Sequence, residues 1–542
     1  MSTVYLYDTT LRDGTQREGI SLSVEDKLRI TQLLDELGIH YIEGGWPGSN
    51  PKDAAYFKQV KQLNLKHSTV CAFSYTGRAV YENVKDDPNI QELLDADTEV
   101  VTIVGKTWLL HVHEVLRVTP QENLDMIEKT VSLLRSEGRR VFYDAEHFFD
   151  GYADDAEYAT ATLQAAVRGG AECVILCDTN GGSLPWQVED ATRHICRELG
   201  VTQATTGSSS DEFYQFKNPS KNLSVGVHTH NDSELAVANA LAAVRAGATQ
   251  VQGTINGYGE RVGNCNLVST IADLKLKMNV DCVSDQALQN LTEASRVVAE
   301  LCNLAPDTHQ PFVGTSAFAH KGGIHADATV KCLHSYQHID PQLVGNRTRV
   351  LLSELSGKGN ILWKADELGL EDKFGKEEAR RIVVQIKEME ARGFAFESAE
   401  ASVALLIRRQ YKDYVPPFEL IDFTSHVTHR QGRGLLAEAT VKVKVNEQIV
   451  HTAAEGNGPV NALDQALRKA LLPHFPKFAD FHLADYKVRI LDGGAATGAT
   501  TRVLIDTQHK QGRWTTTGCS TNIIEASWQA LYDAVEYGLT MV

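Results

Sequence analysis

The chain has 542 residues, of which 42% are hydrophobic and 23% are charged, which is enough for roughly two to four domains with large buried cores. Its formal net charge of −17 at pH 7 excludes nucleic acid and anionic membrane surfaces as general partners. No apolar run approaches the roughly 18 residues of a membrane span, and the N-terminus lacks the basic and apolar regions of a signal peptide. Nine cysteines without a C-x-x-C pair indicate a reduced, cytoplasmic compartment.

The sequence up to residue 281 alternates short apolar runs with amphipathic helical patterns. Ser23, for example, is a candidate N-cap for a helix over Val24–Leu37, and Gly38 follows its end. Repeated strand–helix units predict a parallel (β/α)₈ TIM barrel, with a doubly wound sheet as the structural alternative. The runs expected to form strands are Val4–Tyr7, Tyr41–Gly45, Ser68–Phe73, Val100–Val104, Val141–Ala145, Cys173–Cys177, Ser224–Val227 and Gln250–Ile255.

The rest of the chain predicts two further parts. We expect an α/β protein in which residues 1–281 form the barrel, residues 282–411 a helical linker region and residues 412–542 a C-terminal α+β domain. In the last part a strand–strand–helix block is duplicated, so that Gln465-Ala-Leu recurs as Gln529-Ala-Leu. The polar stretch Gly207–Asn222 is an insertion without an assigned function. The loop-rich segment 308–360 is too long for an idle connection, which indicates a functional or interfacial role.

Polar and ionisable residues follow most of the expected barrel strands. The carboxyl ends of the strands carry the chemistry in a TIM barrel, so these residues are candidates for one site. In chain order they are Arg12 and Asp13 after the first strand, Glu146 after the fifth, Thr179 after the sixth, His228 and His230 at the seventh, and Asn264 after the eighth.

The sharpest signal is the pair His228 and His230. Two residues apart on a strand, both side chains point to the same face. An H-x-H pair alone is weak evidence, but a carboxylate from Asp13 completes a divalent-metal site, with Asn264 as a candidate fourth ligand. Mixed nitrogen and oxygen ligands suit Mn, Mg, Co or Zn, and the sequence does not choose among these metals.

Such a site would bind a 2-oxo acid through a carboxylate oxygen and the keto oxygen. The metal and Arg12 would then polarise the carbonyl and stabilise the alkoxide that develops on attack. Thr179 is placed to hydrogen-bond the substrate carboxylate. Glu146 either orients a base or a water, or forms a salt bridge beside the site.

Three motifs resemble the signatures of the DRE-TIM metallolyase superfamily, and within it those of the 2-isopropylmalate, homocitrate and citramalate synthases. They are Asp8-Thr-Thr-Leu-Arg-Asp-Gly-Thr-Gln16, His228-Thr-His-Asn-Asp232 and Gly257-Tyr-Gly-Glu-Arg-Val-Gly-Asn264. The resemblance covers almost the whole chain, because the duplicated C-terminal domain is similar to that group's allosteric domain. Narrower stretches most resemble the citramalate synthase group, namely Val104–Trp108, Tyr143–Tyr152 and Cys177–Gly182.

The resemblance implies a Claisen-type condensation of acetyl-CoA with pyruvate, followed by thioester hydrolysis, in isoleucine biosynthesis. It implies that Arg12 polarises the keto oxygen and that Glu146 and Thr179 belong to the site. The metal ligands that it implies are Asp13, His228, His230 and Asn264.

The resemblance also implies residues and partners outside the barrel. In Lys321-Gly-Gly-Ile-His-Ala-Asp327, His325 matches the family's candidate base, Asp327 accompanies it, and Tyr336 matches a family tyrosine. Histidine suits this role because its pKa lies near working pH. In the family this segment reaches the barrel of a partner subunit, which implies a homodimer. The C-terminal domain implies feedback by isoleucine, and a dimerisation module without a ligand is the alternative.

Three other functions compete. A 2-isopropylmalate synthase shares the chemistry but takes a larger 2-oxo acid. A lyase such as hydroxymethylglutaryl-CoA lyase runs the carbon–carbon step in reverse, and the C-terminal domain argues against it. A catalytically inactive amino-acid sensor disagrees with the intact Arg12, Asp13 and His325. Phe148 and Phe149, which follow Glu146 closely, either shorten the keto-acid pocket or pack under the barrel loops.

Overall fold

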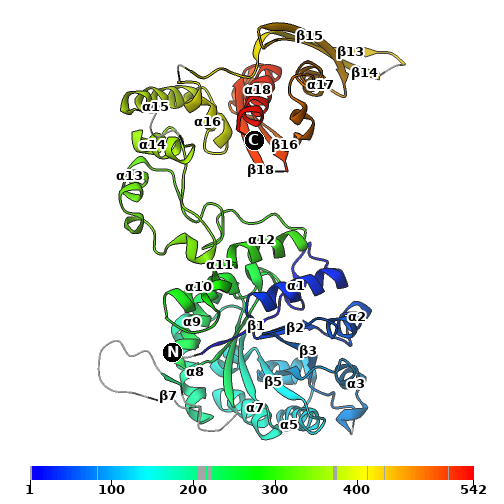
Figure 1. Cartoon of the computed structure of the whole chain (residues 1–542). Helices are drawn as coiled ribbons and strands as arrows, with labels where there is room; N and C mark the ends of the chain where they lie inside the picture. Colours follow the sequence, from blue (N-terminus) through cyan, green and yellow to red (C-terminus); the bar gives the residue numbers. More distant parts are fainter. Residues whose placement is uncertain are drawn as a thin grey trace. The chain divides into compact units, whose positions relative to one another are not determined.

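The computed structural model describes residues 3–81, 83–201, 203–204, 215–216, 223–369, 375–411, 413–432, 434–510 and 512–541 (Figure 1). The chain divides into two compact units, each considered by itself below. The first consists of Met1–Phe318 and Ile339–Arg347, and the second of Ala319–His338 and Thr348–Val542.

The first unit is a closed barrel of parallel strands. Around the barrel the order is β1-β10-β9-β6-β5-β4-β3-β2, so the expected (β/α)₈ fold is confirmed and the open doubly wound sheet is excluded. All eight expected strands form within a few residues of their predicted ends. They are β1 (Tyr5–Asp8), β2 (Tyr41–Gly45), β3 (Thr69–Tyr75), β4 (Val100–Lys106), β5 (Arg140–Glu146), β6 (Cys173–Asp178), β9 (Ser224–Thr229) and β10 (Gln250–Gly253).

Helices surround the barrel (Figure 1). Their apolar side chains share one hydrophobic core with those of the strands. The predicted N-cap is present, since Ser23 and Asp26 form a reciprocal capping box at the start of α1. The helices of this unit are α1 (Val24–Glu36), α2 (Pro51–Val60), α3 (Pro88–Asp95), α4 (Leu109–His111), α5 (Pro120–Ser136), α6 (Phe148–Asp154), α7 (Ala156–Gly169), α8 (Pro185–Glu198), α9 (Ala236–Ala246), α10 (Leu267–Leu276), α11 (Asp285–Gln289) and α12 (Leu291–Leu301).

The barrel interior changes from apolar to polar along the strands. At the amino end, Phe142 of β5 belongs to a small interior core with Tyr7, Cys71, Val100, Cys173, Ile175 and Cys177. Two residues further along the same strand the inward side chain is Asp144, and two further it is Glu146. Because inward residues alternate along each strand, successive positions fill successive layers of the interior. A buried polar layer therefore lies between the apolar core and the carboxyl ends of the strands.

The insertion that the sequence predicts lies mostly outside the described residues. Within it and just before it, β7 (Gln203–Ala204) pairs antiparallel with β8 (Gln215–Phe216).

The second unit contains the linker helices and the C-terminal domain. Its α+β domain repeats three strands and a helix, whereas the sequence predicted two strands per repeat. The strands that the sequence missed are β13 (Glu419–Arg430) and β16 (His482–Ile490), the first strand of each repeat. Many of their side chains are exposed, so the apolar alternation that reveals a half-buried strand is weak in both.

The remaining elements of the second unit follow the expected order. They are β11 (Ala319–His320), α13 (Gly323–Lys331), β12 (Arg349–Val350), α14 (Lys358–Glu367), α15 (Lys376–Ala391), α16 (Glu400–Arg408), β14 (Gly434–Val445), β15 (Gln448–Gly456), α17 (Pro459–Leu471), β17 (Thr501–His509), β18 (Gly512–Ser520) and α18 (Ile523–Met541). Among the described residues of both units, every helix is too short or too polar to cross a bilayer.

Candidate metal and catalytic site

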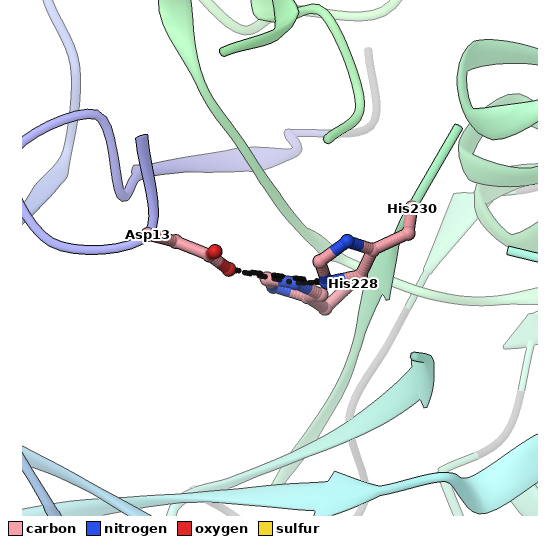
Figure 2. Close-up of side chains that lie close together, drawn as sticks. All are labelled: Asp13, His228 and His230. Atoms are coloured by element: carbon pink, nitrogen blue, oxygen red, sulfur yellow. Dashed lines mark hydrogen bonds and ion pairs between the residues drawn. The ribbon is translucent and has the colours of Figure 1, made fainter. Parts of the chain in front are cut away.

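Asp13, His228 and His230 converge at the carboxyl end of the barrel (Figure 2). The Nε2 atoms of the two histidines lie 3.2 Å apart. The Oδ2 atom of Asp13 lies 3.4 Å from Nε2 of His228 and 3.9 Å from Nε2 of His230. Each of the three residues is at most 5% exposed. Two imidazoles and a carboxylate with converging lone-pair atoms can hold a divalent cation.

A tight turn after β1 places Asp13. Asp8, at the end of the strand, accepts hydrogen bonds from the backbone and the hydroxyl of Thr10, both at 2.8 Å. The backbone carbonyl of Thr9 then accepts from the N–H groups of Arg12 and Gly14. Burial raises the pKa of Asp8 to about 7, and the hydrogen bonds from Thr10 oppose that rise. The Asp-Thr-Thr part of the first motif thus builds the turn that presents the next two charged residues.

Asn264 completes the cluster from the loop after β10. Its Nδ2 atom lies 3.0 Å from Oδ2 of Asp13 and 3.1 Å from Nε2 of His228. Its Oδ1 atom is buried and has no partner among the described residues. A half-turn of the amide exchanges the two atoms, so the oxygen is available to a cation. Gly259 lies directly against this side chain, since a Cβ there would come within 1.8 Å of Oδ1.

The charges of the cluster also fit a cation. Burial alone would raise the pKa of Asp13, but Arg12 and then His228 hold it well below its usual range. Burial, and then His228, lower the pKa of His230 to about 3. Burial lowers the pKa of His228 too, but the hydrogen bond to Asp13 and the negative charges of Asp13 and Asp144 together outweigh burial and raise the pKa. An ionised carboxylate and a neutral imidazole are the forms that bind metal, so a cation would displace any proton from Nε2 of His228.

Arg12 lies beside the cluster in a fixed position. Its Nη1 atom is 3.6 Å from Oδ2 of Asp13, and its Nε–H donates to Oε1 of Glu43 at 2.5 Å. The guanidinium also lies over the ring of Phe73, 4.0 Å from the centroid. The side chain is only 15% exposed, so the charge depends on these neighbours.

Glu43 of β2 is a residue of the site that the sequence analysis missed. It is fully buried and accepts hydrogen bonds from the hydroxyls of Tyr7 at 2.6 Å and Thr9 at 2.7 Å, besides that from Arg12. Its signal in the sequence is a lone carboxylate within the apolar run Tyr41–Gly45. A buried acid requires a cationic or hydrogen-bonding partner, and that partner lies on another strand.

Glu146 and Thr179 lie at the same end of the barrel, on β5 and just after β6. Glu146 forms an ion pair with Lys106 of β4, which is the salt bridge considered as its alternative role. The Thr179 hydroxyl accepts from the backbone N–H of His147 at 2.8 Å, so its own hydrogen is available to a ligand. Lys106 lies in the stretch Val104–Trp108 and is a residue of the site that the sequence pattern does not predict.

His147 holds a left-handed backbone conformation, with φ of 56°. The chain therefore turns sharply after Glu146, and Nδ1 of His147 lies 3.0 Å from Oδ2 of Asp150. The next two residues, Phe148 and Phe149, are both buried in the core around the barrel. Their burial agrees with the interpretation in which these two rings serve packing.

His325 and Tyr336 belong to the second unit. Their rings are stacked, with centroids 4.4 Å apart and an interplanar angle of 27°. Both side chains are exposed, and the neighbouring Ile324 is 80% exposed. Asp327 lies on the same helix, α13, but its side chain falls outside the described part of the chain.

Three families match consecutive parts of the sequence. Residues 3–298 match the HMGL-like family, residues 312–393 the homocitrate synthase post-HMGL domain-like family, and residues 397–539 the LeuA allosteric (dimerisation) domain. The chain belongs to the HMGL-like family. The expected order of a TIM barrel, a helical region and a C-terminal allosteric domain is thereby confirmed.

Relatives match this HMGL-like protein over nearly its whole length. The "(R)-citramalate synthase" of Synechocystis sp. is 51% identical over 100% of this chain and 97% of its own. The "(R)-citramalate synthase" of Geobacter sulfurreducens is 50% identical over 99% and 98% of the two chains. The "2-isopropylmalate synthase" of Yersinia enterocolitica is 30% identical over 97% and 94%. The resemblance to this group of synthases is therefore confirmed.

Enzymes of the HMGL-like family use a divalent metal, and Asp13, His228 and His230 are a possible site for it in this chain. The donor set, the buried Oδ1 of Asn264 and the ionised carboxylate all fit such a cation.

Replacing Glu43 by alanine is expected to destabilise the barrel. The substitution leaves the buried Arg12 guanidinium without its main counter-charge, so the free energy of unfolding should fall by about 3–5 kcal/mol. Urea denaturation measures this change. The matched control is Glu293→Ala, which breaks an exposed pair with Arg296 and should cost at most about 1 kcal/mol. Equal losses for both variants would contradict the role given to Glu43.

Proposed function

We propose that this protein condenses acetyl-CoA with pyruvate and hydrolyses the thioester to (R)-citramalate and CoA, a transferase reaction of isoleucine biosynthesis. The observation that carries the proposal is the full-length similarity to relatives named (R)-citramalate synthase, which are 40–51% identical. The relatives named 2-isopropylmalate synthase are 30% identical and thus more distant.

Residues 1–281 are proposed as the catalytic part, residues 282–411 as the linker that supplies the base, and residues 412–542 as the regulatory part. In the catalytic part Asp13, His228, His230 and Asn264 hold a divalent cation, which is Mn, Mg, Co or Zn. Bound there, the cation supplies Lewis acidity toward the keto oxygen of pyruvate. The convergence of the two Nε2 atoms on the Asp13 carboxylate supports this assignment.

Arg12 and Thr179 are proposed to bind the 2-oxo acid. Arg12 directs one N–H at Glu43, which leaves its terminal N–H groups to donate to the keto oxygen and to stabilise the negative charge that develops on it. Thr179 donates its hydroxyl hydrogen to the substrate carboxylate, because its oxygen already accepts from His147. Glu146, held by Lys106, completes this side of the pocket.

His325 is proposed as the base that removes a methyl proton from acetyl-CoA, with Asp327 and Tyr336 beside it. An imidazole can take that proton near neutral pH, and its stacking on Tyr336 fixes the ring. The exposure of His325, Ile324 and Tyr336 supports a role in which this segment meets a second chain. We therefore propose a homodimer in which each chain supplies the base to its partner, in line with the LeuA dimerisation domain.

A cytoplasmic location belongs to the same proposal. All nine cysteines are free thiols, and eight of them are buried. Buried free thiols suit a reducing compartment.

Loss of a proposed metal ligand should abolish turnover. Asp13→Ala and His228→Ala are each expected to reduce CoA release to background and to lower bound metal, measured by elemental analysis, while circular dichroism stays close to that of the unchanged protein. The control is His194→Ala on α8, a histidine outside the cluster. Near-normal activity of either ligand variant at saturating metal would contradict the assignment.

Pyruvate should be the preferred 2-oxo acid. Release of free CoA from acetyl-CoA, measured with a panel of 2-oxo acids, should give the highest kcat/KM for pyruvate. A methylene mismatch in an apolar pocket is worth about 1–3 kcal/mol, so larger acids should react, but more slowly. A higher kcat/KM for 2-oxoisovalerate would instead identify a 2-isopropylmalate synthase.

Isoleucine is the proposed effector, bound where β15 and β18 lead into helices α17 and α18. The sequence pattern predicts turns at Gly456–Pro459 and Gly518–Thr521, but Gly456 and Gly518–Ser520 are the last residues of these two strands. The N–H groups at helix starts favour a carboxylate, and at α18 those of Ile524 and Glu525 are held by Oδ1 of Asn522, which a ligand would replace. The regulatory part is tied to the end of α15, where Arg502 donates to the carbonyls of Gly393 and Phe394. Two further hydrogen bonds connect α15 to the helix that carries His325. Glu390 of α15 accepts from the backbone N–H of Glu354. The carbonyl of the next residue, Leu355, accepts from the N–H of Gly323 at the start of α13.

Removing the Arg502 contact should weaken feedback. Arg502→Ala is expected to keep uninhibited activity but to lose part of a coupling free energy that is typically about 1–3 kcal/mol, seen as a higher isoleucine concentration for half inhibition. The control is Arg489→Ala, the exposed residue paired with Arg502 across β16 and β17. The regulatory proposal fails if the unchanged enzyme responds to neither isoleucine nor leucine. The C-terminal domain would then be a dimerisation module without a ligand.

A further inference from the structure

The second ring nitrogen of His228 is held inside the barrel. Nδ1 of His228 lies 2.8 Å from Oε1 of Gln252, and Nε2 of Gln252 donates to Oδ1 of Asp144 at 3.0 Å. The three residues come from β9, β10 and β5, and they are 5%, 0% and 3% exposed. They form a buried chain from an interior carboxylate through an amide to an imidazole.

The direction of this chain determines which nitrogen of His228 carries the proton. The amide of Gln252 directs its NH₂ end to Oδ1 of Asp144, and its oxygen end can only accept hydrogen bonds. The oxygen end then faces Nδ1 of His228, which must donate. In the neutral ring of His228 the lone pair is therefore on Nε2, the atom that faces Asp13 and His230.

We propose that Gln252 is a positioning residue for the metal site, with its amide oriented by Asp144. It acts through His228, by fixing the tautomer and the ring orientation in which Nε2 can bind a cation. The inference rests on the metal site of the proposed function, and extends it to two residues that touch neither substrate nor metal. Partners that orient a ligating histidine typically change metal affinity by about 10–100-fold when lost.

Two residues provide an internal comparison. Nδ1 of His230 is buried and has no partner among the described residues, so this form of positioning acts on His228 alone. Gln250 lies two residues before Gln252 on β10 and faces the same barrel interior, one layer further from the cluster. It is 3% exposed, and its Oε1 accepts from the thiol of Cys173 at 3.7 Å.

The test uses the full-length protein, freed of metal by chelation, with Mn²⁺ as the probe. Isothermal titration calorimetry gives the dissociation constant, and thermal unfolding of the metal-free protein gives the stability. Gln252→Met should weaken Mn²⁺ binding by about 10–100-fold. Gln252→Glu should restore most of the affinity, because the introduced carboxyl keeps an acceptor for Nδ1–H and shares a proton with Asp144. Gln250→Met removes an equally buried amide and should leave the affinity unchanged.

An unchanged Mn²⁺ affinity in Gln252→Met would overturn the proposal, as would an equal loss in Gln250→Met, which would indicate a general effect of interior packing. If Gln252→Met does not fold, Asp144→Asn decides instead. An amide at that position accepts either end of Gln252, so binding should weaken several-fold, and an unchanged affinity overturns the proposal. Mn²⁺ binding is measured without substrate. A different preferred 2-oxo acid would therefore end the proposed function and leave this inference standing.

Discussion

The catalytic end of the barrel depends on one buried ion pair, between Arg12 and Glu43. Arg12 lies between two carboxylates, its Nε–H bonded to Glu43 and its Nη1 3.6 Å from Asp13. Water cannot take over the role of Glu43 as a partner of Arg12, because Glu43 is fully buried. Its oxygens also accept hydrogen bonds from Tyr7 and Thr9. The pair keeps a guanidinium charged and fixed beside the metal cluster, and that charge in turn keeps Asp13 ionised. Loss of Glu43 would therefore affect both groups.

A barrel interior can hold so many polar groups because they satisfy one another layer by layer. In the layer below the cluster, Glu43 bonds to Tyr7 of β1 and to residues of the turn after it, and Gln252 links Asp144 to His228. Asp144 has a pKa raised to about 7, because it is buried and lies near Glu43. The register of β9 with β10 puts His228 beside Gln252 and Gly226 beside Gln250. A slip of two residues between these strands would place Gln250, the partner of Cys173, beside His228 in place of Gln252. The strand register therefore determines which group orients His228.

The sequence predicted those features that follow from position along a single strand. The period of two placed His228 and His230 on one face, and apolar runs located all eight barrel strands. Glu43, Lys106 and Gln252 were missed because their importance lies in partners on other strands, which no local pattern reveals. The first strands of the two C-terminal repeats were missed for a different reason. They expose much of their surface, and alternation is visible only where one face is buried.

The two proposed halves of the catalytic machinery are built under opposite constraints. The metal ligands, Arg12 and their supporting residues are buried and fixed by short hydrogen bonds within one barrel. The proposed base is on an exposed helix, with Ile324 and Tyr336 exposed around it. If His325 takes the methyl proton, catalysis requires that this helix be covered by the surface that holds the acetyl group, since water in an open site would protonate the enolate. Proton abstraction would then depend on assembly. A domain that shifts the linker, without touching the metal, could regulate the rate through the base alone.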